Sequence, residues 1–233
     1  MWTHGTIIVA SVGSAPTLFE RQIRLDGCFN FRDLGGYPTR TGRWIRPERL
    51  YRSDGPHALT AADHATLRTL ELRTVIDLRT TEEVETKPSF VTALANVVGY
   101  HLPLLDVVPD TNDLPTWTNP RVVADRYREM LDNGTEMIGE ALAILSDPAT
   151  YPVLIHCTAG KDRTGFLAAI VLGLLDAADE LLTLLAPAMV SARPETMTAF
   201  MDGILRDYGS LAALASALGV DGAPRALRAL LVV

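Results

Sequence analysis

The sequence predicts an α/β fold, with a central, mainly parallel sheet flanked by helices and a helix-rich C-terminal part. Short β-branched, apolar runs alternate with longer segments of helical spacing, which is typical of parallel strands joined by helices. Hydrophobic residues make up 48% of the 233 residues, enough for a full core without disulfides or metals. Since no linker, low-complexity tract or internal repeat divides the chain, we expect one domain with a short N-terminal extension.

The first part of the chain is expected to hold short strands and one helix. Residues 1–18 are interpreted as a tail or an extra strand. Residues 31–53 carry glycines and prolines between short apolar pieces, which predicts turns between short strands. Residues 61–72 place leucines among polar side chains, with Thr60 as N-cap, and predict a helix.

Strands and helices then alternate. Residues 74–78 are a β-branched apolar run that predicts a buried strand. Residues 82–86 predict a helical turn that stops at Pro88, and residues 97–105 predict a further strand. The segment 108–120 is rich in Pro, Asp, Asn and Thr, so we expect a long surface loop there.

The C-terminal half is mostly helical in pattern. Apolar residues have helical spacing from Ala124 to Leu145, and the short apolar run from Pro152 to Ile155 predicts another buried strand. Helical patterns fill most of the remaining chain, with expected breaks at Pro187, Pro194, Gly209 and Gly219.

Charge is unevenly distributed along the chain. The formal net charge is −7, which argues against bulk nucleic-acid binding, because such binding needs a basic face. Between Glu20 and Asp54, however, eight arginines accompany five acids. These arginines either form a solvated face or include one or two residues that line an anion site. They are Arg21, Arg24, Arg32, Arg40, Arg43, Arg46, Arg49 and Arg52.

The cysteines and apolar runs indicate a cytoplasmic protein. Cys28 and Cys157 are too few for a disulfide framework, and no pair of CxxC motifs suggests zinc, so a reducing compartment is expected. The apolar stretch 7–12 follows no Lys or Arg and makes a poor signal peptide. The longest apolar run, 166–175, is far shorter than the roughly 20 residues that span a bilayer, so no stable membrane insertion is expected.

One segment carries the chemistry. A buried-strand pattern over 153–155 and an apolar helix pattern from Phe166 are joined by a short loop that holds Cys157 and Arg163 in Cys-x5-Arg spacing. A loop that leaves a strand and enters a helix turns backbone N–H groups inward, and with the helix dipole these form a cradle for an anion. The loop therefore predicts phosphate binding.

Each side chain of this loop has a chemical reason to be there. The cradle stabilises a thiolate as it stabilises phosphate, so Cys157 can attack phosphorus and form a phosphocysteine. Arg163 can hold two phosphoryl oxygens in a bidentate fork. Gly160 allows the backbone a close approach to the ligand, Thr164 can donate to the departing thiolate, and His156 is expected to orient the loop. We predict phosphate contacts from Thr158, Ala159, Gly160, Lys161, Asp162, Arg163 and Thr164.

These residues carry a resemblance to a known family. His156 to Gly165, HCTAGKDRTG, resembles the signature loop of the protein tyrosine phosphatase superfamily, in the version of the bacterial and fungal atypical tyrosine/serine phosphatases that also act on phosphoinositides. Asn30 to Gly36 is similar to that family's NFRDLGG motif. Further similar segments are Leu50–Ser53, Val75–Arg79 and Tyr208–Leu211. The resemblance covers about residues 19–233, which predicts a phosphatase domain there and leaves residues 1–18 as an extension.

The resemblance implies a protein tyrosine phosphatase-like fold and hydrolysis of phosphomonoesters with no metal and no cofactor. The implied substrates are phosphotyrosine and phosphoserine/threonine proteins and phosphoinositides. Lys161 adds a cation that suits a substrate with more than one phosphate, unless it only acts on the thiol or faces water. The chain has no Trp-Pro-Asp loop like that of ordinary tyrosine phosphatases, and the segment 175–193 is shorter than in the atypical relatives, which predicts a reduced lid or substrate rim.

Three aspartates compete for the role of general acid, which a phosphomonoester needs for its departing oxygen. Asp162 lies inside the loop, where the resembling family has a proposed acid. Asp106 follows the strand expected over 97–105, at a point where dual-specificity phosphatases place theirs. Asp77 ends its own expected strand, where ligands of α/β folds tend to bind. We favour Asp162 and keep the other two as alternatives.

Two other functions compete with phosphatase activity. A rhodanese-like sulfurtransferase also places a cysteine in a strand-to-helix loop, but Arg163-Thr164 and the resemblance of Asn30 to Gly36 weigh against it. A catalytically silent phosphate-binding module is the second alternative, although such silence usually follows loss of the Cys or the Arg.

Overall fold

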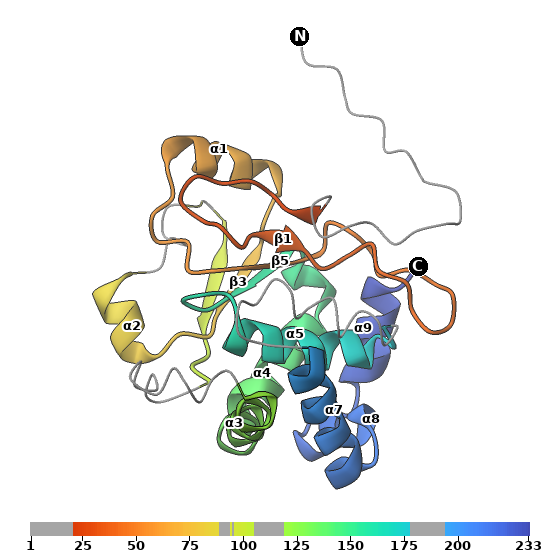
Figure 1. Ribbon diagram of the computed structural model, residues 1–233. Coiled ribbons are helices and arrows are strands. Elements are labelled where there is room, and N and C mark those ends of the chain that lie inside the picture. Colours follow the sequence, from red (N-terminus) through yellow and green to blue (C-terminus); the bar gives the residue numbers. More distant parts are fainter. Residues whose placement is uncertain (1–20, 89–93, 95, 105–118, 178–193) are drawn as a thin grey trace.

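A computed structural model describes residues 21–88, 94, 96–104, 119–177 and 194–233. Within these ranges the strands form one five-stranded sheet of order β1-β2-β5-β3-β4 (Figure 1). The β1–β2 pair is antiparallel, and the remaining neighbours are parallel, so the expected mainly parallel α/β sheet is confirmed. The strands are β1 Arg32–Asp33, β2 Leu50–Ser53, β3 Thr74–Asp77, β4 Val98–His101 and β5 Val153–His156.

The register of the sheet brings the ends of three strands together. Strands β2, β3 and β5 are buried at every position, which explains the apolar and β-branched character of β3 and β5; β2 also buries Arg52 and Ser53. Ser53 of β2 and Asp77 of β3 both lie opposite His156 of β5. The carboxyl ends of these parallel strands therefore meet beside the residue that follows His156, which is Cys157.

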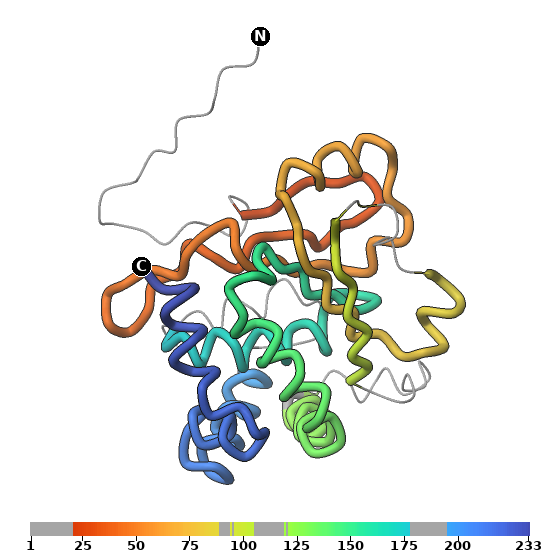
Figure 2. Tube along the Cα trace, turned by 180° about the vertical axis from the view of Figure 1, so that it is seen from behind, coloured from red at the N-terminus to blue at the C-terminus, as the bar shows by residue number. Residues whose placement is uncertain are grey.

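Helices cover the two faces of the sheet unequally. On one face, Leu67 of α1 (Ala61–Thr69) packs with Tyr51, Val75 and Leu154 of the sheet. On the other face lies the larger core, and Figures 1 and 2 both show the remaining long helices gathered there. These are α3 Pro120–Asn133, α4 Thr135–Leu145, α5 Asp162–Leu174, α7 Pro194–Tyr208, α8 Leu211–Ala217 and α9 Ala223–Leu231.

The two short N-terminal helices begin in the same way. Thr60 caps α1, as expected, and forms a capping box with Asp63. The helical turn expected over 82–86 is α2, Thr81–Thr86, and its cap Thr80 forms a capping box with Glu83. In both cases a threonine hydroxyl accepts from the third backbone N–H of the helix, which fixes the starting point.

The helical spacing from Ala124 to Leu145 belongs to two helices, because Gly134 ends α3 and starts α4. Gly209 and Gly219 follow α7 and α8 with φ of 78° and 75°, so these two expected breaks are confirmed as left-handed helix ends. Pro194 starts α7. Within the described part of the chain, no helix combines the length and apolar character needed to cross a membrane.

Several expectations concern residues outside the described ranges. They are the tail or strand over 1–18, the loop over 108–118, the break at Pro187 and most of the segment 175–193.

Candidate active site

The loop from Cys157 to Lys161 leaves β5 and enters α5, as the sequence predicts. Cys157 is 2% exposed. Gly160 has a φ of 64°, and a Cβ atom at this position would lie only 2.4 Å from the carbonyl oxygen of Ser53. Glycine is therefore required because the loop passes against the backbone of β2, a contact within the protein in addition to the expected one with a ligand.

The backbone N–H groups of this loop are available to a ligand. From Thr158 to Thr164, none donates a hydrogen bond to a described residue, and the first bond of the helix runs from Gly165 N–H to the Lys161 carbonyl at 2.6 Å. Lys161, the N-cap, provides no side-chain cap. Unsatisfied donors at a helix N-terminus are an anion site.

Two side chains from other parts of the chain donate hydrogen bonds to the carbonyl groups of the loop. Asn30 Nδ2 donates to the Ala159 and Gly160 oxygens at 3.3 and 3.1 Å. Arg52 Nη2 donates to the Gly160 oxygen at 2.6 Å. Since each peptide group points its C=O and N–H in opposite directions, these bonds leave the N–H groups facing the other way. Both side chains come from the segments that resemble family motifs.

Arg163 is held by Glu83, a residue that the sequence analysis did not single out. Arg163 Nη1 and Nη2 donate to the two Glu83 oxygens at 2.5 and 2.9 Å, and Thr158 Oγ1 also donates to Glu83. Burial opposes the charge of Glu83, but hydrogen bonds from Arg163, Thr158 and Thr80 outweigh it and lower its pKa to about 2. The pattern Thr80-x-x-Glu83 could have indicated the capping box, but nothing in it indicates that Glu83 also binds Arg163 of the loop.

Arg163 itself is 8% exposed. Burial opposes the charge of Arg163, but the hydrogen bonds to Glu83 and the charges of Cys157 and Glu83 keep the Arg163 pKa above its ordinary value. Its Nε donates no hydrogen bond to a described residue. One edge of the guanidinium thus remains available beside the loop.

Asp77 and His156 form a buried group behind Cys157. Arg79 donates to Asp77 through Nε at 2.9 Å and Nη2 at 2.6 Å. Burial alone would raise the pKa of Asp77, but the hydrogen bonds from Arg79 outweigh burial, so the Asp77 pKa lies below its ordinary value. Burial lowers the pKa of His156, whose Nδ1 lies 3.2 Å from the Cys157 carbonyl oxygen and Nε2 3.6 Å from Asp77. His156 is therefore placed to orient the loop.

Asp162 is bound by a tyrosine from α3. Tyr127 Oη donates to Asp162 Oδ1 at 3.0 Å. The Tyr127 ring is fully buried and packs edge-on against Phe166 of α5 and Phe200 of α7. Burial, and then the Asp162 charge, raise the Tyr127 pKa, so the hydroxyl stays protonated and donates.

Among the remaining predicted residues, Thr164 is fully buried, and its Oγ1 has no hydrogen-bond partner among the described residues. Lys161 is partly buried and makes no side-chain contact with a charged or polar group in the described ranges. Asp106 lies outside these ranges. Within them, no cluster of three His, Cys, Asp or Glu side chains could hold a metal ion.

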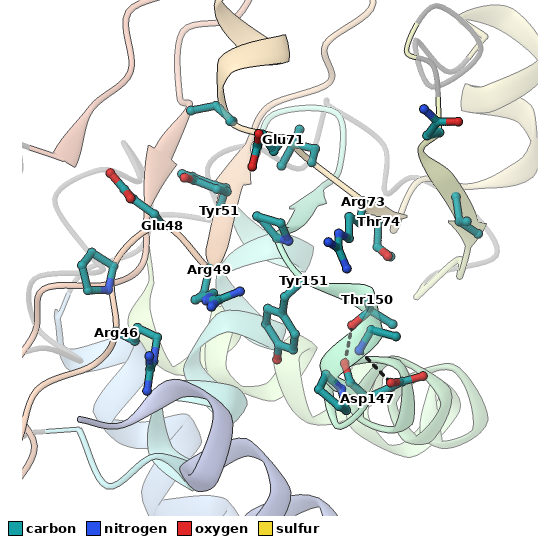
Figure 3. Close-up of a pocket in the computed structure, with 18 of the residues that line it drawn as sticks. Arg46, Glu48, Arg49, Tyr51, Glu71, Arg73, Thr74, Asp147, Thr150 and Tyr151 are labelled. Carbon is teal, nitrogen blue, oxygen red and sulfur yellow. Dashed lines mark hydrogen bonds between the residues drawn. The ribbon is translucent and has the colours of Figure 1, made fainter. Parts of the chain in front are cut away.

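Two of the cavities that described residues line lie at opposite ends of the strands. One, of about 380 Å³, adjoins the loop and is lined by Thr158, Glu83 and their polar neighbours. A larger one, about 1150 Å³, lies at the amino ends of the strands, where Figure 3 shows Arg49 and Arg73 on either side of Tyr151. Of these two, the smaller touches the Cys157 loop, and ligands of α/β folds bind at the carboxyl ends of strands.

Comparisons with known proteins found a matching family and similar relatives. Residues 23–184 match the tyrosine phosphatase family. A Cupriavidus necator protein named as a tyrosine-protein phosphatase is 34% identical over 184 residues, 73% of this chain and 65% of that protein. The triple specificity protein phosphatase PtpB of Mycobacterium tuberculosis is 34% identical over 178 residues, 64% of this chain and 62% of that protein. The chain thus spans less than two thirds of the length of these curated relatives.

A solved structure resembles the chain more distantly. The core catalytic domain of the PP-IP phosphatase Siw14 from S. cerevisiae, in complex with citrate, aligns with 84% of this chain and 97% of that chain. The sequences are 19% identical and the TM-score is 0.47.

Proposed function

The chain belongs to the tyrosine phosphatase family, and on that premise we propose that it hydrolyses phosphomonoesters through a phosphocysteine on Cys157, without a metal or other cofactor. The observation that carries this proposal is the loop from Thr158 to Thr164, which follows β5 and Cys157 and whose N–H groups donate to no described residue. A thiol placed in such a donor cradle is a nucleophile aimed at a bound phosphate.

In the first step, the Cys157 sulphur forms a bond to phosphorus while the bond to the leaving oxygen breaks. Asp162 gives its proton to that oxygen. In the second step, water attacks phosphorus and gives a proton to the Asp162 carboxylate, Cys157 departs as thiolate, and phosphate is released. Thr164 Oγ1, which is buried without a partner among the described residues, is the donor that stabilises the departing thiolate.

Arg163 stabilises the charge on the phosphoryl oxygens. Glu83 occupies the Nη1–Nη2 end of the guanidinium, so the Nε–Nη2 edge is the one that binds phosphate. Because Glu83 fixes the plane of the guanidinium in advance, this donor needs little reorganisation during the reaction.

Asp162 is the general acid that we favour. Tyr127 occupies only Oδ1 of its carboxyl group, which leaves Oδ2 to carry the proton. Asp77 is disfavoured because the Arg79 guanidinium binds both of its oxygens and lowers its pKa, which keeps it ionised. Asp106 remains an alternative that the described ranges do not include.

The proposed substrates are phosphorylated proteins, with phosphotyrosine or phosphoserine/threonine, and phosphoinositides. The match to a triple specificity phosphatase supports this range. Lys161 supports substrates with a second phosphate, since its ammonium has no partner among the described residues. We further propose that residues 19–233 form one phosphatase domain in the cytoplasm, where free thiols such as Cys28 and Cys157 persist.

An assay with a chromogenic aryl phosphate, run with and without a chelator, tests the proposal. We expect full activity in chelator and complete loss in the Cys157→Ser variant. Sulfur transfer from thiosulfate to cyanide, with no phosphate release, would indicate the sulfurtransferase instead. Phosphate binding without turnover would indicate a silent binding module.

A further inference from the structure

Arg52 is the most deeply buried cation next to the loop. It is 0% exposed and lies on β2, directly opposite Ile155 of β5. Its Nη2 donates to the Gly160 oxygen at 2.6 Å and to the Lys161 oxygen at 3.4 Å. Among the described residues, no carboxylate forms an ion pair with it, and its Nε and Nη1 have no hydrogen-bond partner. A buried, unpaired guanidinium is unfavourable for stability, so its presence needs another explanation.

The groups that face Arg52 belong to the loop and its surroundings. Burial lowers the Arg52 pKa to about 10, and nearby acidic groups, Cys157 and Asp162 among them, oppose that shift. The guanidinium therefore stays protonated at neutral pH.

A second arginine fixes the other side chain that holds the loop. Arg32, the neighbour of Arg52 across the β1–β2 ladder, donates through Nη1 to Asn30 Oδ1. This bond sets the orientation of the Asn30 amide, so its Nδ2 faces the Ala159 and Gly160 oxygens. Burial, and then the charge of Arg52, lower the Arg32 pKa to about 9. Two like charges are thus kept together in the interior beside the loop.

We propose that Arg52 is a positioning residue of the phosphatase reaction: it holds the carbonyl groups of Gly160 and Lys161 away from the phosphate, so that the N–H groups of the same loop face the phosphate. Asn30 has the same role on the neighbouring peptide groups. This inference rests on the proposed function, since it assigns Arg52 a role in the same loop.

Substitutions separate the hydrogen bonds of Arg52 from its charge. Arg52→Met removes both the hydrogen bonds and the charge, whereas Arg52→Lys keeps a charge but cannot make the same planar contacts. Asn30→Ala removes carbonyl contacts only. Arg49→Met is a matched control, because Arg49 is exposed and lines the cavity at the amino ends of the strands.

The readout is the rate of thiol alkylation by iodoacetamide at a fixed pH, with and without inorganic phosphate. Cys28 does not interfere, because burial and the bond to Asp54 raise its pKa and keep it protonated.

We expect phosphate protection to weaken roughly tenfold or more in Arg52→Met, because the peptide groups of the loop are no longer held in place for the oxyanion. Arg52→Lys should not restore the protection, and Asn30→Ala should weaken it as well. Arg49→Met should leave the protection unchanged.

Unchanged phosphate protection in folded Arg52→Met would overturn the proposal. If that variant does not fold, as judged by circular dichroism, then Arg52→Lys and Asn30→Ala decide: wild-type phosphate protection in both would overturn it equally. Alkylation does not require turnover, so absence of phosphatase activity in the wild-type protein would refute the proposed function while the role of Arg52 is still measured.

Discussion

Glu83→Gln tests whether Glu83 prepares Arg163 for the reaction. The substitution keeps the size of the side chain, but an amide presents one acceptor and one donor where Arg163 needs two acceptors. One of the two bonds, at 2.5 and 2.9 Å, is lost and the charge that balances the guanidinium disappears. Hydrogen bonds to charged groups contribute about 1.5–3 kcal/mol each. We expect about 2–4 kcal/mol less transition-state stabilisation, or roughly a 30- to 1000-fold lower kcat/KM.

The measurement is steady-state hydrolysis of an aryl phosphate, with two controls from the same helix. Glu82→Gln changes an exposed neighbour that lines the same small cavity and should keep near-wild-type kinetics. Thr80→Ala removes the cap of α2 but leaves the Glu83–Arg163 bonds, so it should lower stability by about 1 kcal/mol with little loss of rate. A kcat/KM for Glu83→Gln within about threefold of wild type would refute the claim that Glu83 orients the Arg163 guanidinium for the reaction.

The same carboxylate predicts a pH dependence of stability. The Glu83 pKa falls from 4.5 to about 2 on folding, so the ionised form stabilises the native state. This contribution is fully present above about pH 4.5 and is lost as the pH falls towards 2. Acid unfolding followed by circular dichroism should show a smaller loss over this window in Glu83→Gln than in the wild-type protein.

Four further variants test the mechanism. Cys157→Ser should lose turnover but still bind vanadate in a calorimetric titration, because the backbone donors remain; substantial residual activity would remove Cys157 from the role of nucleophile. Arg163→Lys should lower kcat/KM strongly, since a lysine cannot make the two-bond fork, and unchanged kinetics would show that Arg163 does not touch phosphate. Asp162→Asn should slow phosphoserine hydrolysis far more than hydrolysis of an activated aryl phosphate and flatten the basic limb of the pH profile; equal losses on both substrates would mean that Asp162 only shapes the loop. Tyr127→Phe should show a weaker form of the same leaving-group dependence if it orients Asp162.

The chemistry of the loop could be read from the sequence because it is local. A buried strand, a Cys-x5-Arg loop and an apolar helix are adjacent in the chain, and this order alone turns the backbone N–H groups of the loop inward. The strands β3 and β5 were predictable for a similar reason, since their β-branched, apolar runs match a buried position in a parallel sheet. Strand β2 has no such run, and its sequence, Leu50–Ser53, stood out only through the family resemblance. The break between α3 and α4 was not predicted, because helical spacing continues across Gly134.

The partners of the loop were decided by the tertiary structure. Glu83 lies 80 positions from Arg163, Tyr127 lies 35 from Asp162, and Asn30 lies 130 from Gly160. The sequence offered many carboxylates and eight arginines between Glu20 and Asp54, and nothing in their spacing distinguishes Arg52 from Arg49. The strand order β1-β2-β5-β3-β4 makes the difference, because it places β2 beside β5 and directs Arg52 at Gly160, while Arg49 stays outside the sheet. Sequence patterns report local backbone preference and the period of burial, whereas the pairing of distant charges depends on which elements become neighbours.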